Sequence, residues 1–262
     1  MEPIEAKLLQ PEMVKRLHQA LTGGSEELFQ TMLDTTPEVV RAGLKNRALQ
    51  SEHLLVLLKR RDLPEELLQH VGRLDLVAGN HHLQRALASN PSTPGQMVLA
   101  LLPHLFLFEL LDICLLAGPS PDQKLAAERV IIQRLPTTEA GQKLTLARRG
   151  TPTLLAELLK YGEVQVVAAC LDNPHLRESA IMQFLQGKNA TAETISMIAR
   201  NPRWKTRPNI RHAMLKNQKT PGIWFTLFLP QLASSEIKGL LMSNRLSPAQ
   251  KTLVREELRR RR

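Results

Sequence analysis

The residues best suited to bind a partner lie in a basic stretch, residues 194–235, that contains no Asp or Glu. Lys and Arg recur through it, and aromatic and His residues are interleaved with them. Cations of this kind neutralise phosphate or carboxylate groups, and an exposed aromatic ring among them is suited to stack on a nucleic-acid base. The predicted binding residues are Arg200, Arg203, Trp204, Lys205, Arg207, Arg211, Lys216 and Lys219.

Spacing within this stretch sharpens the expected surface. Arg207 and Arg211 are four residues apart, so they lie close to one face of a helix that starts near Pro208. Trp204 falls in a predicted turn and is the stacking candidate. Trp224 falls in a predicted helix and is expected in the core.

Two kinds of partner fit such a surface. We expect a protein with an acidic surface, which makes the chain a non-enzymatic interaction scaffold that uses its basic second half. The alternative is a nucleic acid, DNA or RNA, bound through residues 200–219. Two further interpretations stay open: a basic face that is merely solvated, and an assembly factor whose halves bind different partners.

No motif in the sequence predicts catalysis, a cofactor or a metal. A Gly-rich phosphate loop, G-x-S-x-G and H-E-x-x-H do not occur. His81 and His82 are adjacent, so their side chains diverge on a helix, and no Cys or carboxylate stands at ligand spacing. Cys114 lies in an apolar segment with acids nearby, which predicts a raised pKa and disfavours a nucleophile. We therefore expect no enzyme activity and no cofactor.

The elements that carry these residues occur twice, at a constant offset of 127 residues. Residues 90–124 and 217–251 show it most clearly, and the match extends over residues 12–135 and 139–262 without a gap. Two tandem copies, residues 1–138 and 139–262, are therefore predicted. The first holds 14 Lys and Arg against 16 Asp and Glu, and the second 21 against 9, so their net charges are −2 and +12. The basic stretch belongs to one copy only, which argues against a scaffold requirement for it.

Each copy is expected to contain about nine short helices, about eighteen in all. Leu and Ala supply most of the apolar content, and aromatic residues are 3% of the chain, which favours helices over strands. Six Ser-Pro or Thr-Pro pairs mark expected helix starts, where the hydroxyl caps a backbone N–H and Pro fits the first helical position. Residues 164–170 come nearest to a strand pattern, but their counterparts, residues 37–43, predict a helix.

A recurrent phrase, Leu-x-Asn-Pro or a close variant, precedes several of these helices. Its Asn stands at Asn90, Asn173, Asn201 and Asn217, and Asn residues recur at intervals of 43 or 44 residues, for example from Asn46 to Asn90 and from Asn173 to Asn217. This resembles bacterial HEAT-like α-solenoids, especially the leucine-rich repeat variants. The resemblance implies an all-α, right-handed α-solenoid of stacked short helices, with the two copies forming one continuous array and presenting a protein-binding surface.

One apolar run, residues 97–118, approaches the length of a membrane span. It contains Pro103 and two acids, Glu109 and Asp112, which are costly near the middle of a bilayer. We therefore predict two helices broken near Pro103 and no span. The N-terminus lacks the basic start and long apolar core of a signal peptide, and two distant cysteines fit a reducing compartment, so a cytoplasmic location is expected.

Overall fold

A computed structural model describes residues 11–243 and 245–261. Their secondary structure consists of nineteen α-helices and three 3₁₀ helices, without a strand in these two ranges. The prediction of an all-α fold is therefore confirmed, and residues 164–170 lie inside a helix. A 3₁₀ turn breaks the apolar run at Pro103, as predicted. Over the same two ranges, no helix combines the length and the apolar character needed to cross a membrane.

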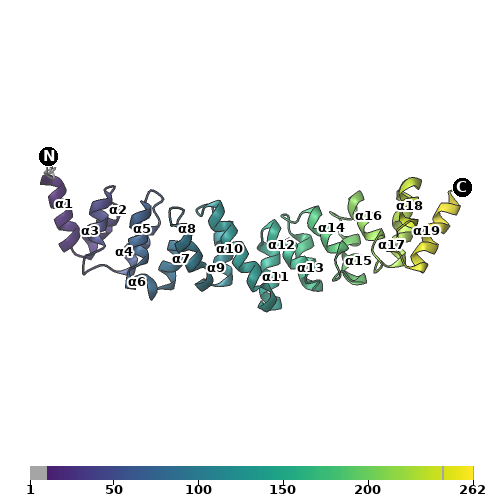
Figure 1. The fold of residues 1–262 in the computed structure, drawn as a ribbon, viewed down its shortest axis with the longest axis horizontal. Coiled ribbons are helices and arrows are strands. Elements are labelled where there is room, and N and C mark those ends of the chain that lie inside the picture. The colour runs from purple at the N-terminus through teal and green to yellow at the C-terminus, as the bar shows by residue number, and fades with distance from the viewer. Residues whose placement is uncertain (1–10, 244, 262) are drawn as a thin grey trace, which may run out of the picture. The chain divides into compact units, whose positions relative to one another are not determined.

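The chain divides after Ile131 into two compact units, called here the first and the second unit. The copies defined by sequence, residues 1–138 and 139–262, stay a prediction. In both units the helices follow one another in chain order (Figure 1). The first unit contains α1 (Pro11–Thr22), α2 (Ser25–Leu33), α3 (Pro37–Gly43), α4 (Ser51–Leu58), α5 (Glu65–Gly72), α6 (Asp75–Ala78), α7 (His81–Ser89), α8 (Gly95–Leu101), η1 (Leu102–His104), α9 (Leu107–Leu115) and most of α10 (Pro121–Arg134).

The second unit repeats this order of elements. It contains η2 (Leu135–Thr137), α11 (Ala140–Arg149), α12 (Pro152–Leu159), α13 (Val164–Asp172), α14 (Glu178–Gln186), α15 (Ala192–Arg200), α16 (Pro208–Leu215), α17 (Gly222–Phe228), η3 (Leu229–Gln231), α18 (Ser234–Leu241) and α19 (Pro248–Arg260). Shifted by 127 residues, nine helices of the first unit begin and end within two residues of a helix here. The short α6 is the exception, since residues 202–205 form turns.

Helices in the second unit alternate between two rows. One row consists of α11, α13 and α15, each in contact with the next, and the other of α12, α14 and α16. The side chains between the rows are apolar residues at helical spacing, such as Leu154, Leu155, Leu158 and Leu159, all fully buried. Burying one such side chain contributes about 1.5–3 kcal/mol, and helices of eight or nine residues need it because they are marginal alone.

Asparagines at four turns bond back to earlier helices, and three of them, Asn46, Asn90 and Asn173, are buried. In each case Nδ2 donates to a carbonyl at the C-terminal end of an earlier helix, a group with no partner inside its own helix. The four donor and acceptor pairs are Asn46 with Ala20, Asn173 with Ala147, Asn90 with Leu58, and Asn217 with Leu185. Both pairs of equivalent asparagines therefore make equivalent bonds 127 residues apart, which gives the repeated phrase a structural role.

Three of the six predicted hydroxyl caps are present. The side-chain oxygens of Ser120, Thr151 and Ser247 accept from the backbone N–H three residues further on. At Ser120 and Ser247 a Gln also returns a bond to the cap residue, which completes the capping box. At these three helices, the Ser or Thr before Pro caps the helix as the local sequence predicts.

The prediction for Thr93 and Thr220 is wrong. Their hydroxyls donate backwards, at 2.6 Å, to the carbonyls of Leu87 and Met214, and the following helices begin after the Pro. Both threonines are buried, so each hydroxyl needs a partner inside the protein, and a carbonyl at the end of the preceding helix supplies it. Thr36 also forms no cap and accepts from an arginine of α1.

Candidate interaction surface

Seven of the eight predicted residues lie at the two ends of α16, and Arg211 lies within the helix. Arg200 ends α15, and Arg207 is the N-cap of α16, so most of the set lies on the α15–α16 turn, residues 200–207. Lys216 is the C-cap of α16, and Lys219 follows it. An eight-residue helix is about 12 Å long, so the sequence cluster forms two separate groups of cations rather than one.

Trp204 is buried, and its predicted stacking role is wrong. Its side chain is 2% exposed, and Nε1 donates to the carbonyl of Leu171 at 3.1 Å. A nucleic-acid base has no access to a ring in this position. The indole instead fixes the α15–α16 turn to the end of α13. Trp224 lies in the core, as predicted, and donates to Ser196 Oγ at 2.9 Å.

Arg203 is bound to the scaffold through its guanidinium. Its guanidinium donates to the carbonyls of Asn173, Pro174 and Leu176 at 2.8–3.0 Å. The same group lies 4.3 Å above the Trp204 ring. Three of its five N–H donors are therefore used on the neighbouring turn, which gives Arg203 a structural role, and its partner-binding role stays a prediction.

Arg211 also makes a scaffold contact, although Arg207 and Arg211 stand on α16 at the predicted spacing. Arg211 Nε donates to the carbonyl of Lys205 at 2.5 Å, and its guanidinium lies 5.7 Å from the Phe228 ring centre. In the first unit Gln84 makes the equivalent bond, to Ala78 at 3.0 Å. The fold needs a hydrogen-bond donor at this position, and a neutral amide supplies it as well as a guanidinium does. The positive charge of Arg211 is therefore not required for the bond.

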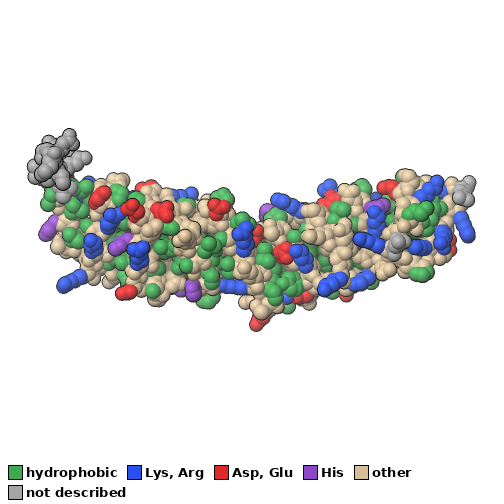
Figure 2. All heavy atoms as spheres, in the orientation of Figure 1, with side chains coloured by type: hydrophobic (Ala, Val, Ile, Leu, Met, Phe, Trp, Pro, Cys, Tyr) green, Lys and Arg blue, Asp and Glu red, His purple; other side chains and the backbone are tan. Residues whose placement is uncertain are grey.

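The remaining cations of the α15–α16 turn project into solvent. Arg200, Lys205 and Arg207 are exposed, and no side chain in the described ranges forms an ion pair with any of them. Lys and Arg side chains elsewhere on the visible face of the second unit are spread along it (Figure 2). The turn therefore presents three unneutralised charges on a backbone that Trp204 anchors.

His212 adds no positive charge to this surface at neutral pH. Burial, and then repulsion from Lys216, lower its pKa from the ordinary value, although Glu236 opposes the shift. Its Nδ1 is buried and makes no hydrogen bond within the described structure. The neutral ring lines a hollow of about 230 Å³ together with residues of α14, α16 and α18.

The His and Cys side chains considered for metal binding or nucleophilic chemistry are held in structural contacts or buried. His81 Nε2 lies 2.6 Å from Glu109 Oε2, the oxygen that also accepts from Phe106 N at the start of α9. Burial, together with the carboxylate of Glu128, raises the pKa of the Cys114 thiol to about 12. The described residues include no group of three or more His, Cys, Asp or Glu placed to hold a metal ion.

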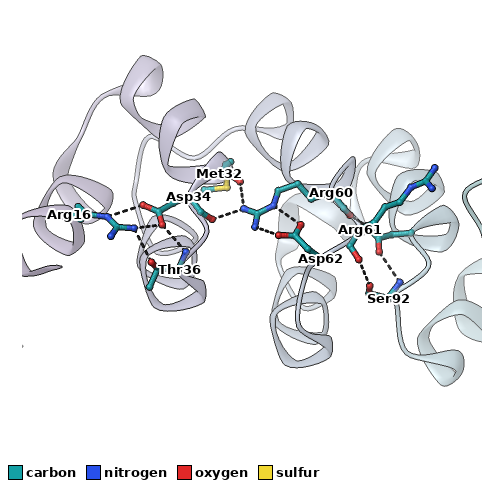
Figure 3. Close-up of polar contacts among 9 residues, drawn as sticks. Arg16, Met32, Asp34, Thr36, Arg60, Arg61, Asp62 and Ser92 are labelled. Atoms are coloured by element: carbon teal, nitrogen blue, oxygen red, sulfur yellow. Dashed lines mark hydrogen bonds and ion pairs between the residues drawn. The ribbon is translucent and has the colours of Figure 1, made fainter. Parts of the chain in front are cut away.

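Two other turns of the first unit, after α2 and after α4, are held by ion pairs that the sequence did not reveal (Figure 3). Arg60 donates to the carbonyls of Met32 and Asp34 at 2.9 and 2.6 Å, and also to both oxygens of Asp62. Arg16 pairs with Asp34 on the preceding turn. The Arg60 guanidinium thus reaches the C-terminal end of α2, an earlier helix than its own. The alternation of Arg and Asp along these turns is the signal that predicts such a network.

Comparison of the chain with protein-family models, with curated proteins and with solved structures finds no match.

Proposed function

We propose that the chain is a non-enzymatic helical-repeat scaffold that binds the acidic surface of a protein partner through the α15–α16 turn. The observation that supports this is the set of three exposed cations, Arg200, Lys205 and Arg207. They lie on a turn that Trp204 fixes in place, without an ion-pair partner in the part of the chain described. Because the turn is already ordered, binding sacrifices little backbone entropy.

The scaffold we propose is a right-handed, HEAT-like α-solenoid of the leucine-rich-repeat-variant type, built from two tandem copies of one unit. Nine helices recur at a shift of 127 residues, and equivalent asparagines donate to equivalent carbonyls in both units. Within each unit, helices contact the next helix but one. Such stacks present turns and one row of helices as extended binding surfaces.

An acidic protein suits this turn better than a nucleic acid does. Non-specific binding of single strands combines cations with aromatic platforms, and Trp204 is buried here. The guanidinium of Arg203 already donates three of its N–H groups to backbone carbonyls, so fewer donors remain for phosphate oxygens. What is left is a group of three exposed charges on one turn, which matches a small cluster of carboxylates. Exposed pairs contribute about 0–1 kcal/mol each, so binding is expected to be weak and sensitive to salt.

A scaffold without catalysis also agrees with the state of the reactive side chains. The thiols of Cys114 and Cys170 both have a pKa raised to about 12 by burial, so neither is a thiolate near neutral pH. Glu109 is bonded to His81 and to the start of α9, and the pKa of its carboxyl is lowered. Burial alone raises it, but the bonds from Phe106 and His81 together outweigh that effect.

The test is titration of the full chain with a poly-glutamate peptide and with single-stranded RNA of equal charge. We expect poly-glutamate to bind at low salt and to be released as salt rises. Arg200→Glu combined with Arg207→Glu is expected to abolish binding. The matched control, Arg255→Glu with Arg259→Glu, makes the same charge change on α19 and should weaken binding much less.

Two results would overturn the proposal. If poly-glutamate does not bind at low salt, the acidic-protein assignment is wrong. If RNA binds through Arg200 and Arg207 while poly-glutamate does not, the turn belongs to a nucleic-acid-binding protein instead.

A further inference from the structure

A second group of cations surrounds a hollow at the far end of α16. The hollow has a volume of about 330 Å³ and lies where the ends of α14 and α16 meet the turn after α18. Lys216, Lys219 and Arg245 line it, and the amide side chains of Asn217 and Gln218 lie between them. No acid lines this hollow, so three positive charges face one small volume without neutralisation.

Two hydrogen bonds fix the floor of the hollow. Asn217 Nδ2 donates to the carbonyl of Leu185 at 2.6 Å, and its Oδ1 accepts from Lys219 N at 2.8 Å. Lys219 Nζ donates to the carbonyl of Lys188 at 2.7 Å, which leaves two of its three N–H donors for a ligand. Lys216 and Arg245 form no ion pair with any described side chain and are exposed.

The first unit shows that the fold does not require these charges. At the positions of Lys216, Lys219 and Arg245, the first unit has Ser89, Ser92 and Gly118. Ser92 Oγ donates to the carbonyl of Arg61 at 3.1 Å, the same contact that Lys219 makes with Lys188 (Figure 3). A neutral hydroxyl therefore serves the scaffold equally well.

The second unit also lacks the acid and the long basic side chain that the first unit has next to this position. Gly187 and Asn189 stand where the first unit has the ion pair of Arg60 and Asp62. Gly187 lines the hollow, so no long side chain fills this position. Asn189 keeps a scaffold contact through its amide, which donates to the carbonyl of Lys160 at 2.5 Å. Around this hollow the second unit therefore has three cations where the first unit has neutral residues, and it lacks the acid that the first unit has at Asp62.

We propose that this hollow is a binding site for a small molecule that carries phosphate groups, held by Lys216, Lys219 and Arg245. Its volume lies at the lower end of the range of ligand pockets, about 300–1,000 Å³. Three converging cations match the multiple negative charge of a phosphorylated ligand, and ammonium and guanidinium donors form strong bonds to phosphate oxygens. The site lies about 12 Å from the α15–α16 turn and does not depend on the function proposed for that turn.

The experiment is calorimetric titration of the full chain with inorganic tripolyphosphate, with sulfate at matched ionic strength as the comparison anion. The test variant, Lys216→Ser with Lys219→Ser and Arg245→Gly, installs the residues that the first unit has at these positions. Each lost charge-assisted bond is expected to weaken binding roughly tenfold, so the triple variant should lose measurable binding. The single variant Lys216→Ser repeats the test with the least change to the fold.

The matched control variant removes three charges elsewhere in the same unit. Lys238→Ser, Lys251→Ser and Arg255→Ser on α18 and α19 should leave tripolyphosphate affinity within about threefold of the original, because exposed charges at a distance are screened. Equal weakening in this control would show a general charge effect and overturn the site. Absence of tripolyphosphate binding at low salt, or equal binding of sulfate, would overturn it too.

Further arms of the titration identify the source of the phosphate. Vesicles with and without a phosphorylated inositol lipid, and single-stranded RNA, are titrated with the native chain and the triple variant. Hollow-dependent binding of RNA without binding of tripolyphosphate would overturn the small-molecule assignment, and so would the same result with vesicles. The function proposed for the α15–α16 turn is tested separately, because its test uses poly-glutamate as the ligand and replaces Arg200 and Arg207.

Discussion

Replacement of Trp204 by alanine is expected to destabilise the second unit, because the indole is a core group. Removing a buried Trp side chain costs about 3–5 kcal/mol. The change also deprives the Leu171 carbonyl of its 3.1 Å bond and Arg203 of the ring 4.3 Å below it. Domains are typically stable by only about 5–15 kcal/mol, so the melting temperature of the unit should fall by about 10 °C or more.

Tryptophan fluorescence follows the second unit alone, because the two tryptophans of the chain, Trp204 and Trp224, both lie in it. In Trp204→Ala the remaining fluorophore is Trp224, which is buried and should redden as its unit unfolds. Circular dichroism at the helix band reports both units. We expect the fluorescence transition to move to lower temperature, while the part of the dichroism signal that the first unit supplies stays in place.

Trp204→Phe is the matched control, since it keeps an aromatic ring while it removes the N–H donor and part of the indole volume. Its cost should be about 1–3 kcal/mol, the cost of leaving a buried carbonyl unpaired, and therefore smaller than that of alanine. A Trp204→Ala chain that melts like the native protein and binds RNA less tightly would refute the structural role. That result would place the ring on a ligand.

Other consequences concern backbone, thiols and histidine. Gly162 has φ of 72°, and a Cβ there would lie 2.6 Å from a backbone oxygen. Gly162→Ala should therefore destabilise the protein by about 1 kcal/mol or more and lower its melting temperature by several degrees. Gly141→Ala is the control, because nothing lies within 4 Å of a Cβ there and the melting temperature should not fall. The thiols of Cys114 and Cys170 have a pKa of about 12, so Ellman's reagent at pH 8 should react only at the rate of unfolding. Because the unfolded thiols ionise from about pH 9, stability should fall as the pH rises from 9 towards 12 in urea titrations, and replacing both with Ser should flatten that slope. The lowered pKa of His212 makes the unfolded state bind its proton first, so stability should fall as the pH drops below 6.5, less so in His212→Gln.

The helices of this chain were predictable because their signals are local or repeated. Pro37, Pro121 and Pro248 stand at the first position of their helices, where the sequence placed them. The short α6 was missed because its four residues carry no cap or period of their own.

The roles within the basic stretch were less predictable, because their partners lie far away in the sequence. The carbonyl that binds Trp204 is 33 residues earlier, and the carbonyls that bind Arg203 are 27–30 residues earlier. Composition cannot show which side chain of such a turn is buried. One signal was available: the counterpart of Trp204 in the first unit is Val77, and an apolar residue at an equivalent position predicts a place in the core.

Comparison of equivalent bonds shows how the second unit carries its charge. Gln84 and Arg211 donate to equivalent carbonyls, and so do Ser92 and Lys219. A contact of this kind requires a hydrogen-bond donor that reaches a carbonyl, and it does not specify the charge of that donor. The scaffold therefore accepts a cation in place of a neutral group without losing the bond.

This substitution also fixes the cations in position before any partner arrives. A free Lys side chain loses about 2 kcal/mol of conformational entropy when a partner orders it completely. Lys219 has already lost part of that freedom to its bond with Lys188, and two donors remain unused. Lys216 carries the same charge at the same hollow without such a bond. Of these two lysines, Lys219 should therefore contribute more to affinity for each charge, although it is the one that also serves the fold.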